Sequence, residues 1–193
     1  MHEPDYFQPP FMLERIVAST HALGFDMASE PRTGTLLRAL AASKPSGQFL
    51  ELGTGTGVAT SWLLAGMDAH SKLTSVDTNA QVQAVAREFL GADSRLTLVL
   101  EDGLQFLRRQ EPERYDFVFA DAIPGKYEGL QDCLRLVKPS GFYVIDDMLP
   151  QDNWPEGHAE KVPVLLQALA SDNNFAIVPM TWASGIVVAV KRQ

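Results

Sequence analysis

Apolar residues recur along the chain with two different spacings. A spacing of three and four positions is typical of amphipathic helices, whereas short apolar runs rich in β-branched and aromatic residues are typical of buried strands. The helical spacing covers residues 11–23, 33–42, 58–67, 79–90, 103–109, 127–137 and 162–169. The strand pattern covers residues 48–52, 72–77, 96–100, 115–121, 142–147, 175–179 and 185–190.

The alternation of these strands and helices predicts an α/β fold, in which helices cover both faces of a doubly wound, mainly parallel sheet. No helix separates the last two strands, so they are expected to pair antiparallel through residues 182–184. If the chain reverses direction after the third strand, the first and fourth strands become neighbours, and a ligand is expected in the crevice between them. A chain of 193 residues favours a single domain, with an N-terminal arm and helix over 1–30 and the core over 31–193.

A glycine-rich turn, Gly53-Thr54-Gly55-Thr56-Gly57, joins the strand 48–52 to the next helix. Its glycines permit positive φ angles and let a ligand approach main-chain N–H groups. Glu51 gives this loop a carboxylate, which would repel a pyrophosphate but suits an ammonium or a hydroxyl group. Asp77 closes the next strand, where an acid can accept both hydroxyls of a ribose. Together these residues predict a site for a small molecule with a nucleoside part.

Acids stand at the ends of the first five predicted strands. Because the carboxyl ends of parallel strands meet at one edge of a sheet, these acids are expected to converge on one site. They are Glu51, Asp77, Glu101, Asp102, Asp121, Asp146 and Asp147.

The composition narrows the class of partner. A net charge of −8 argues against nucleic acid, since affinity for a phosphate backbone comes largely from Lys and Arg. The acidic, Pro-containing N-terminus is unlike a secretory signal, and no apolar run is long enough to span a membrane. The single cysteine, Cys133, is expected to pack as a small apolar residue on a helix. We therefore expect a cytoplasmic protein.

The order of an acid, an apolar residue and G-x-G-x-G, with acids at the following strand ends, resembles class I S-adenosylmethionine-dependent methyltransferases. This resemblance implies a seven-stranded sheet of order 3-2-1-4-5-7-6 with an antiparallel seventh strand. It also implies that the methionine end meets the glycine-rich turn, that Asp77 holds the ribose and that Asp102 receives the adenine amino group. Thr33 either closes over the methionine part or caps a helix. The full set of cofactor-binding residues predicted in this way is Thr33, Glu51, Gly53, Thr54, Gly55, Gly57, Asp77, Thr78, Asp102, Gly103 and Asp121.

The short chain, the helix before the glycine-rich strand, and Asp121 followed by Asp146-Asp147 look like the catechol and caffeoyl-coenzyme A O-methyltransferase branch. In that branch an acid and an acid–amide pair hold a divalent cation. The resemblance therefore implies that Asp121, Asp146 and Asp147 bind Mg²⁺, Ca²⁺ or another divalent cation, which would lower the pKa of a bound hydroxyl. This sequence departs from the branch by having Asp147 where asparagine is usual. It also lacks a lysine close after Asp121.

Three residues are candidates for catalysis: Asp121, Lys126 and His158. Lys126 is the nearest lysine after Asp121, but such a residue is more often a solvated side chain than a base. His158 follows a loop over residues 150–158 and is either a base near neutral pH or a structural residue. Trp154 and Tyr6 either form walls for a planar acceptor or pack in the ordinary way.

We interpret the sequence as an enzyme that transfers a methyl group from S-adenosyl-L-methionine to an oxygen of a small-molecule acceptor. A metal-independent methyltransferase with a histidine or lysine base is a second interpretation. A non-catalytic cofactor-binding or assembly module is a third, and a nicotinamide oxidoreductase is a fourth. The sequence names neither the acceptor nor the oligomeric state, and it leaves a homodimer open.

Overall fold

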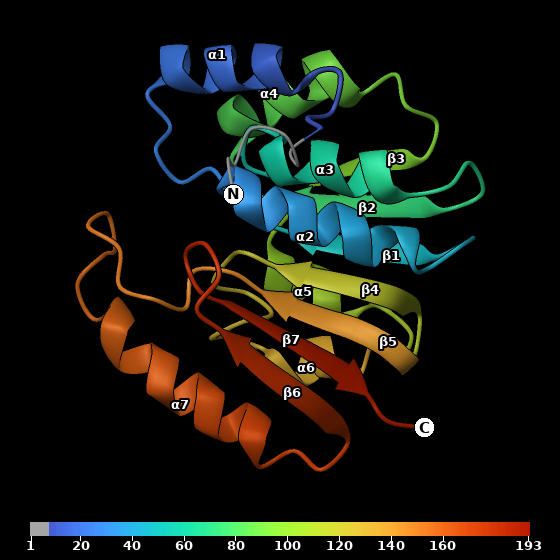
Figure 1. The fold of residues 1–193 in the computed structure, drawn as a ribbon, viewed down its shortest axis with the longest axis vertical. Coiled ribbons are helices and arrows are strands. Elements are labelled where there is room, and N and C mark those ends of the chain that lie inside the picture. Colours follow the sequence, from blue (N-terminus) through green and yellow to red (C-terminus); the bar gives the residue numbers. More distant parts are fainter. Residues whose placement is uncertain (1–7) are drawn as a thin grey trace.

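The computed structural model describes residues 8–193, in which one seven-stranded sheet is flanked by helices (Figure 1). The order β3-β2-β1-β4-β5-β7-β6 confirms the predicted topology. The strands are β1 (Gln48–Leu52), β2 (Lys72–Asp77), β3 (Leu96–Leu100), β4 (Tyr115–Ala120), β5 (Val137–Ile145), β6 (Phe175–Met180) and β7 (Ile186–Lys191). The helices are α1 (Leu13–Leu23), α2 (Pro31–Ala42), α3 (Val58–Gly66), α4 (Ala80–Leu90), α5 (Gly103–Arg108), α6 (Leu130–Leu134) and α7 (His158–Ala170).

The direction of the strands places the site. β1 lies between β2 and β4 and is parallel to both, so the predicted crevice beside β1 is present. β7 pairs antiparallel with β5 and with β6, which confirms the predicted hairpin (Figure 1). The carboxyl ends of β1, β2, β4 and β5 therefore lie along one edge of the sheet.

The sheet carries one apolar cluster on each face. Alternate residues of a strand point to opposite faces, so in β4 Phe117 and Phe119 pack with α1 to α4, whereas Val118 and Ala120 pack with α5 to α7. All four side chains are completely buried. Burial on both faces explains why β4 appears in the sequence as a continuous apolar run.

The boundaries of several predicted helices are shifted in the structure. The helix expected over 127–137 is only the short α6, and Val137 begins β5 instead. Val137 is three residues after Leu134, so its spacing suited a helix, but pairing with Tyr115 of β4 places it in the sheet. α2 begins at Pro31 rather than at residue 33, so Thr33 lies buried inside the helix and does not precede it.

Cys133 is buried on α6, as predicted, and burial raises the pKa of its thiol. No helix within residues 8–193 is long and apolar enough to cross a membrane. Residues 1–7 lie outside the described part of the chain. The expectations for the first part of the N-terminal arm and for Tyr6 as a wall of the site therefore concern residues that the structure does not describe.

Candidate active site

The glycine-rich loop is held by hydrogen bonds to the neighbouring strand. Gly53 N–H donates to the Val76 carbonyl at 2.9 Å, and Gly55 N–H donates to Asp77 Oδ2 at 2.8 Å. The other oxygen of Asp77 accepts the N–H of Asn79 at 2.8 Å. At Gly53, φ is +96° and an added Cβ would lie 2.6 Å from the Asp121 carbonyl oxygen, so no larger residue fits. Asp77 thus fixes the loop and still has lone pairs to offer a ligand.

Glu51 lies beneath this loop rather than in it. Its side chain is completely buried and accepts hydrogen bonds from the hydroxyls of Thr60 and Ser75. The Ser75 hydroxyl in turn bonds to that of Thr54 at 2.7 Å. Desolvation raises the pKa of Glu51 to about 8, so near neutral pH it is mostly an uncharged acid. The expectation that Glu51 gives the loop a carboxylate for an ammonium or a hydroxyl of the ligand is therefore wrong.

A cavity of about 640 Å³ extends from the glycine-rich loop to the ends of β4 and β5. A volume of this size suits a cofactor together with a small acceptor. Among the predicted site residues, those that line it are Gly53, Thr54, Gly55, Asp77, Thr78, Gly103, Asp121, Lys126, Asp146, Asp147, Trp154 and His158. We call the part lined by residues 53–56, 76–79 and 103 the cofactor end, and the part lined by residues from the segments 121–127 and 146–158 and by residue 184 the acceptor end.

Four predicted cofactor residues do not line the cavity: Thr33, Glu51, Gly57 and Asp102. Gly57 is the N-cap residue that precedes α3, and an added Cβ there would lie 2.8 Å from the Cβ of Ala86, so it allows α3 and α4 to approach closely. Asp102 caps α5 by accepting the N–H of Gln105 at 2.9 Å. These residues support the site from outside its wall.

Each of the three predicted metal ligands already has its own hydrogen-bond donor at the acceptor end. Asp121 accepts the hydroxyl of Ser29 at 3.1 Å, and Asp146 accepts the hydroxyl of Ser184. Asp147 has a φ of +64°, a conformation that Asp and Asn tolerate better than most residues, and its Oδ2 accepts Trp154 Nε1–H at 2.7 Å. Burial, followed by the charge of Asp146, raises the pKa of Asp121 to about 7, and burial also raises that of Asp146.

Lys126 is buried beside these acids, contrary to the expectation of a solvated side chain. Only 3% of it is exposed, and its Nζ donates to the main-chain carbonyl of Asp146 at 2.6 Å. Burial lowers the pKa of Lys126, and the carboxylates of Asp121, Asp147 and Asp146 oppose this shift.

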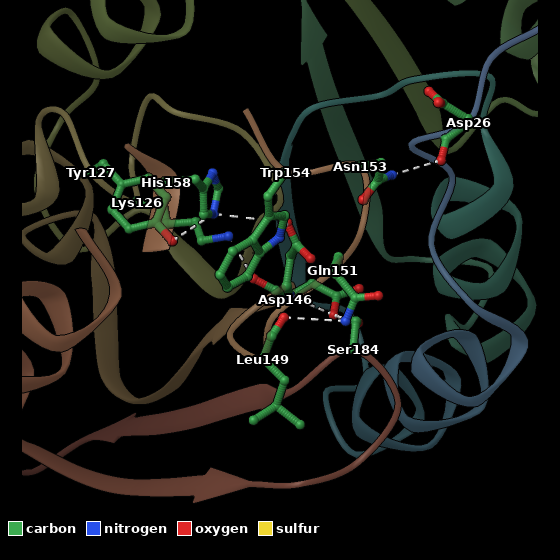
Figure 2. A network of polar contacts seen from close by, with 11 residues as sticks. Asp26, Lys126, Tyr127, Asp146, Leu149, Gln151, Asn153, Trp154, His158 and Ser184 are labelled. Atoms are coloured by element: carbon green, nitrogen blue, oxygen red, sulfur yellow. Dashed lines mark hydrogen bonds and ion pairs between the residues drawn. The ribbon is translucent and has the colours of Figure 1, made fainter. Parts of the chain in front are cut away.

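An aromatic group encloses His158 (Figure 2). Trp154 stacks on the imidazole with ring centres 4.4 Å apart, and Tyr127 meets it edge-on at 5.0 Å. A hydrogen bond of 3.0 Å joins Tyr127 Oη to His158 Nε2, and Asp147 Oδ2 lies 3.9 Å from the same nitrogen. Burial lowers the pKa of His158, which keeps the imidazole neutral near pH 7.

A segment far away in the sequence covers the acceptor end. Asn153 Nδ2 donates to the main-chain carbonyl of Asp26 at 3.0 Å, so residues 25–30 meet the loop after β5 (Figure 2). Both segments line the cavity. Sequence reasoning identified the loop over 150–158 but missed residues 25–30, Tyr127 and Ser184. Nothing in their local sequence marks them, although Tyr127 adjoins a candidate base.

Comparisons with known proteins agree with this geometry. Residues 50–148 match the family described as a methyltransferase domain. The chain belongs to that family. It is 31% identical over 191 residues to a Mycolicibacterium smegmatis protein with a provisional O-methyltransferase name, covering 92% of this chain and 91% of that protein. A Mycobacterium protein (strain JLS) with the same kind of name is 33% identical over 140 residues, which cover 68% of this chain and 64% of the relative.

The methyltransferase domain also has the fold of solved O-methyltransferases. The structure of TomG from Streptomyces achromogenes, an O-methyltransferase involved in tomaymycin synthesis and in complex with S-adenosylmethionine, superposes with a TM-score of 0.81. The two are 19% identical, and the match covers 100% of both chains.

The donors of the methyltransferase domain suit S-adenosylmethionine but not the predicted metal. The cofactor end offers main-chain groups and the Asp77 carboxylate, as a ribose and an amino acid require. Across the part of the chain that the structure describes, no group of three or more His, Cys, Asp or Glu side chains is arranged to hold a metal ion. The prediction of Asp121, Asp146 and Asp147 as a ligand set is therefore not supported. Each acid bonds to a different partner, and Lys126 lies beside them.

Proposed function

We propose that this protein transfers a methyl group from S-adenosyl-L-methionine to a hydroxyl oxygen of a small-molecule acceptor. The observation that carries the proposal is one continuous cavity with two chemically different ends. The cofactor end has a glycine-rich loop tied to Asp77, and the acceptor end has an aromatic wall, a neutral histidine and buried charged groups. The provisional O-methyltransferase names of the relatives support oxygen as the methyl acceptor.

S-adenosylmethionine supplies an electrophilic methyl group when it is bound. What the acceptor end has to supply is orientation and a place for the acceptor's proton. We propose that the proton passes to His158 through the Tyr127 hydroxyl, because a hydrogen bond of 3.0 Å joins that hydroxyl to Nε2. The carboxylate of Asp147, 3.9 Å from Nε2, would stabilise the imidazolium that results. The face of Trp154 gives a planar acceptor a surface to stack on.

The function is tested by incubating the purified protein with S-adenosylmethionine labelled in its methyl group and a panel of phenols, catechols and aliphatic alcohols. Product analysis is expected to show label on an acceptor oxygen, together with S-adenosylhomocysteine. Binding of the cofactor without transfer to any acceptor would favour the non-catalytic module. Label on nitrogen, carbon or sulfur alone would contradict the assignment of oxygen.

Asp77 is the residue to change at the cofactor end. Asp77→Ala is expected to weaken cofactor binding by about 1.5–3 kcal/mol, because two charge-assisted hydrogen bonds to the ribose are lost. Asp102→Ala is the matched control, since Asp102 caps α5 and does not line the cavity, and it is expected to cost less. Calorimetry measures both. Unchanged affinity in Asp77→Ala would reject the ribose assignment.

A further inference from the structure

The position of Lys126 is built by the loop that follows β4. Gly125 N–H donates to the Glu128 carbonyl at 2.7 Å, and the buried Tyr143 hydroxyl donates to the Gly125 carbonyl at 2.6 Å. Gly125 has a φ of +83°, and an added Cβ would lie 2.3 Å from Leu52 Cδ1, so only glycine lets the loop lie this close to β1. These contacts anchor the main chain at the residue before Lys126.

The ammonium of Lys126 lies at the end of the cavity that three strand-end acids also line. It donates to the main chain of Asp146 at the end of β5, while Lys126 itself belongs to the loop that begins with Asp121 (Figure 2). Asp121, Asp146, Asp147 and Lys126 all line the same end of the cavity. A buried ammonium is costly unless opposite charges compensate it, and three carboxylates without a cation would repel one another.

We propose that the Lys126 ammonium is the resident cation of the acceptor end and that it, rather than a divalent ion, supplies the positive charge that compensates Asp121, Asp146 and Asp147. The main-chain bond to Asp146 and the glycine-dependent loop hold it there. The inference deepens the proposed function and depends on it for the consequence at the acceptor. An acceptor oxygen would meet an N–H donor and the aromatic wall rather than a metal.

The direct test is binding of a divalent cation to the protein. Binding is monitored as a loss of the electron paramagnetic resonance signal of free Mn²⁺. Wild type is expected to take up no Mn²⁺ at the cavity. Lys126→Met leaves the three acids without their cation and is expected to bind one Mn²⁺ at least about tenfold more tightly than wild type. Lys161→Met is the matched control, because Lys161 is exposed on α7, and it is expected to behave as wild type.

Thermal stability gives an independent measurement. Lys126→Met is expected to melt below wild type and to recover when Mn²⁺ is added. The double variant that combines Lys126→Met with Asp121→Asn is expected to regain its melting temperature without Mn²⁺, because one charge of each sign is then removed. If Lys126→Met does not fold alone, either Mn²⁺ or Asp121→Asn should restore folding.

Three results would overturn the proposal. The first is stoichiometric uptake of Mn²⁺ by wild type that Asp146→Asn abolishes, and the second is equal uptake by Lys126→Met and Lys161→Met. The third is failure of both Mn²⁺ and Asp121→Asn to restore Lys126→Met. These measurements need no methyl transfer. An absence of turnover would therefore reject the proposed function and leave the result on the cation standing.

Discussion

The cofactor end and the acceptor end of the cavity are assembled in different ways. At the cofactor end, the residues come from three consecutive strand–helix turns, and hydrogen bonds such as Gly55 N–H to Asp77 Oδ2 join the first two. At the acceptor end, contacts join residues far apart in the sequence, such as Ser29 with Asp121 and Asn153 with Asp26. One end thus depends on local main-chain geometry and the other on side chains brought together by the whole fold. If this comparison holds, changes at each end should affect different measured quantities.

The largest effect is expected at the acceptor end. His158→Gln should lower kcat by about 100- to 10,000-fold, the usual contribution of a positioned proton acceptor, and leave cofactor affinity unchanged. The wild-type rate should rise with pH and level off above a midpoint below 6.5, because burial lowers the pKa of His158. Steady-state kinetics and calorimetry measure these quantities. The exposed His70→Gln is the control. A matching loss of cofactor affinity in His158→Gln would show that the two ends are not separable.

At the cofactor end, Gly55→Val should weaken cofactor binding by about 100-fold or more, because a branched side chain would enter the ligand's space and meet Phe25. The matched control is Gly24→Val. Gly24 has a φ of +70°, so the backbone cost is similar, but an added Cβ meets nothing within 4 Å and the residue does not line the cavity. Calorimetry with S-adenosylhomocysteine distinguishes the two variants. Equal affinities would mean that the loop has a purely structural role.

The smallest effect, counted per pH unit, concerns the support beneath the loop. Glu51 keeps its proton in the folded protein up to about pH 8, whereas the unfolded chain loses it near 4.5, so wild-type stability falls as pH rises between these values. Glu51→Gln does not titrate. It should therefore gain stability relative to wild type by about 1.4 kcal/mol per pH unit across this window. Urea unfolding at several pH values, with the exposed Glu156→Gln as control, measures the gain. A constant difference at all pH values would contradict the assignment.

The same contrast explains what could be predicted from the sequence. The cofactor end was largely predictable, because glycine spacing and an acid after β2 are short-range signals of a turn with positive φ angles. The alternation of strands with helices predicted a mainly parallel sheet with a final hairpin, and the resemblance to methyltransferases implied the strand order. Glu51 was the exception. Its place near the end of a strand suggested a carboxylate for the loop, whereas in the structure its side chain points toward α3 and accepts the hydroxyls of Thr60 and Ser75.

The acceptor end was predicted less well for a physical reason. Trp154 and His158 stood out by their residue type, but their contacts with each other and with Tyr127 depend on how α7 packs against the loop after β4. Lys126 was expected in solvent, because its burial depends on Gly125 and Tyr143, and no short-range pattern encodes that contact. The burial of a charged side chain such as Lys126 therefore depends on contacts that form only in the folded chain.

The burial of Cys133 has a practical consequence for following the loop over the cavity. The sequence contains no other cysteine, and this thiol is enclosed and held in its unreactive protonated form. A cysteine introduced at the exposed Asp152 would therefore be the only site open to maleimide dyes. A fluorophore there, next to the Asn153 bond to Asp26, could report in solution whether this contact opens when ligands enter. The natural chain is thus a ready background for site-specific spectroscopy.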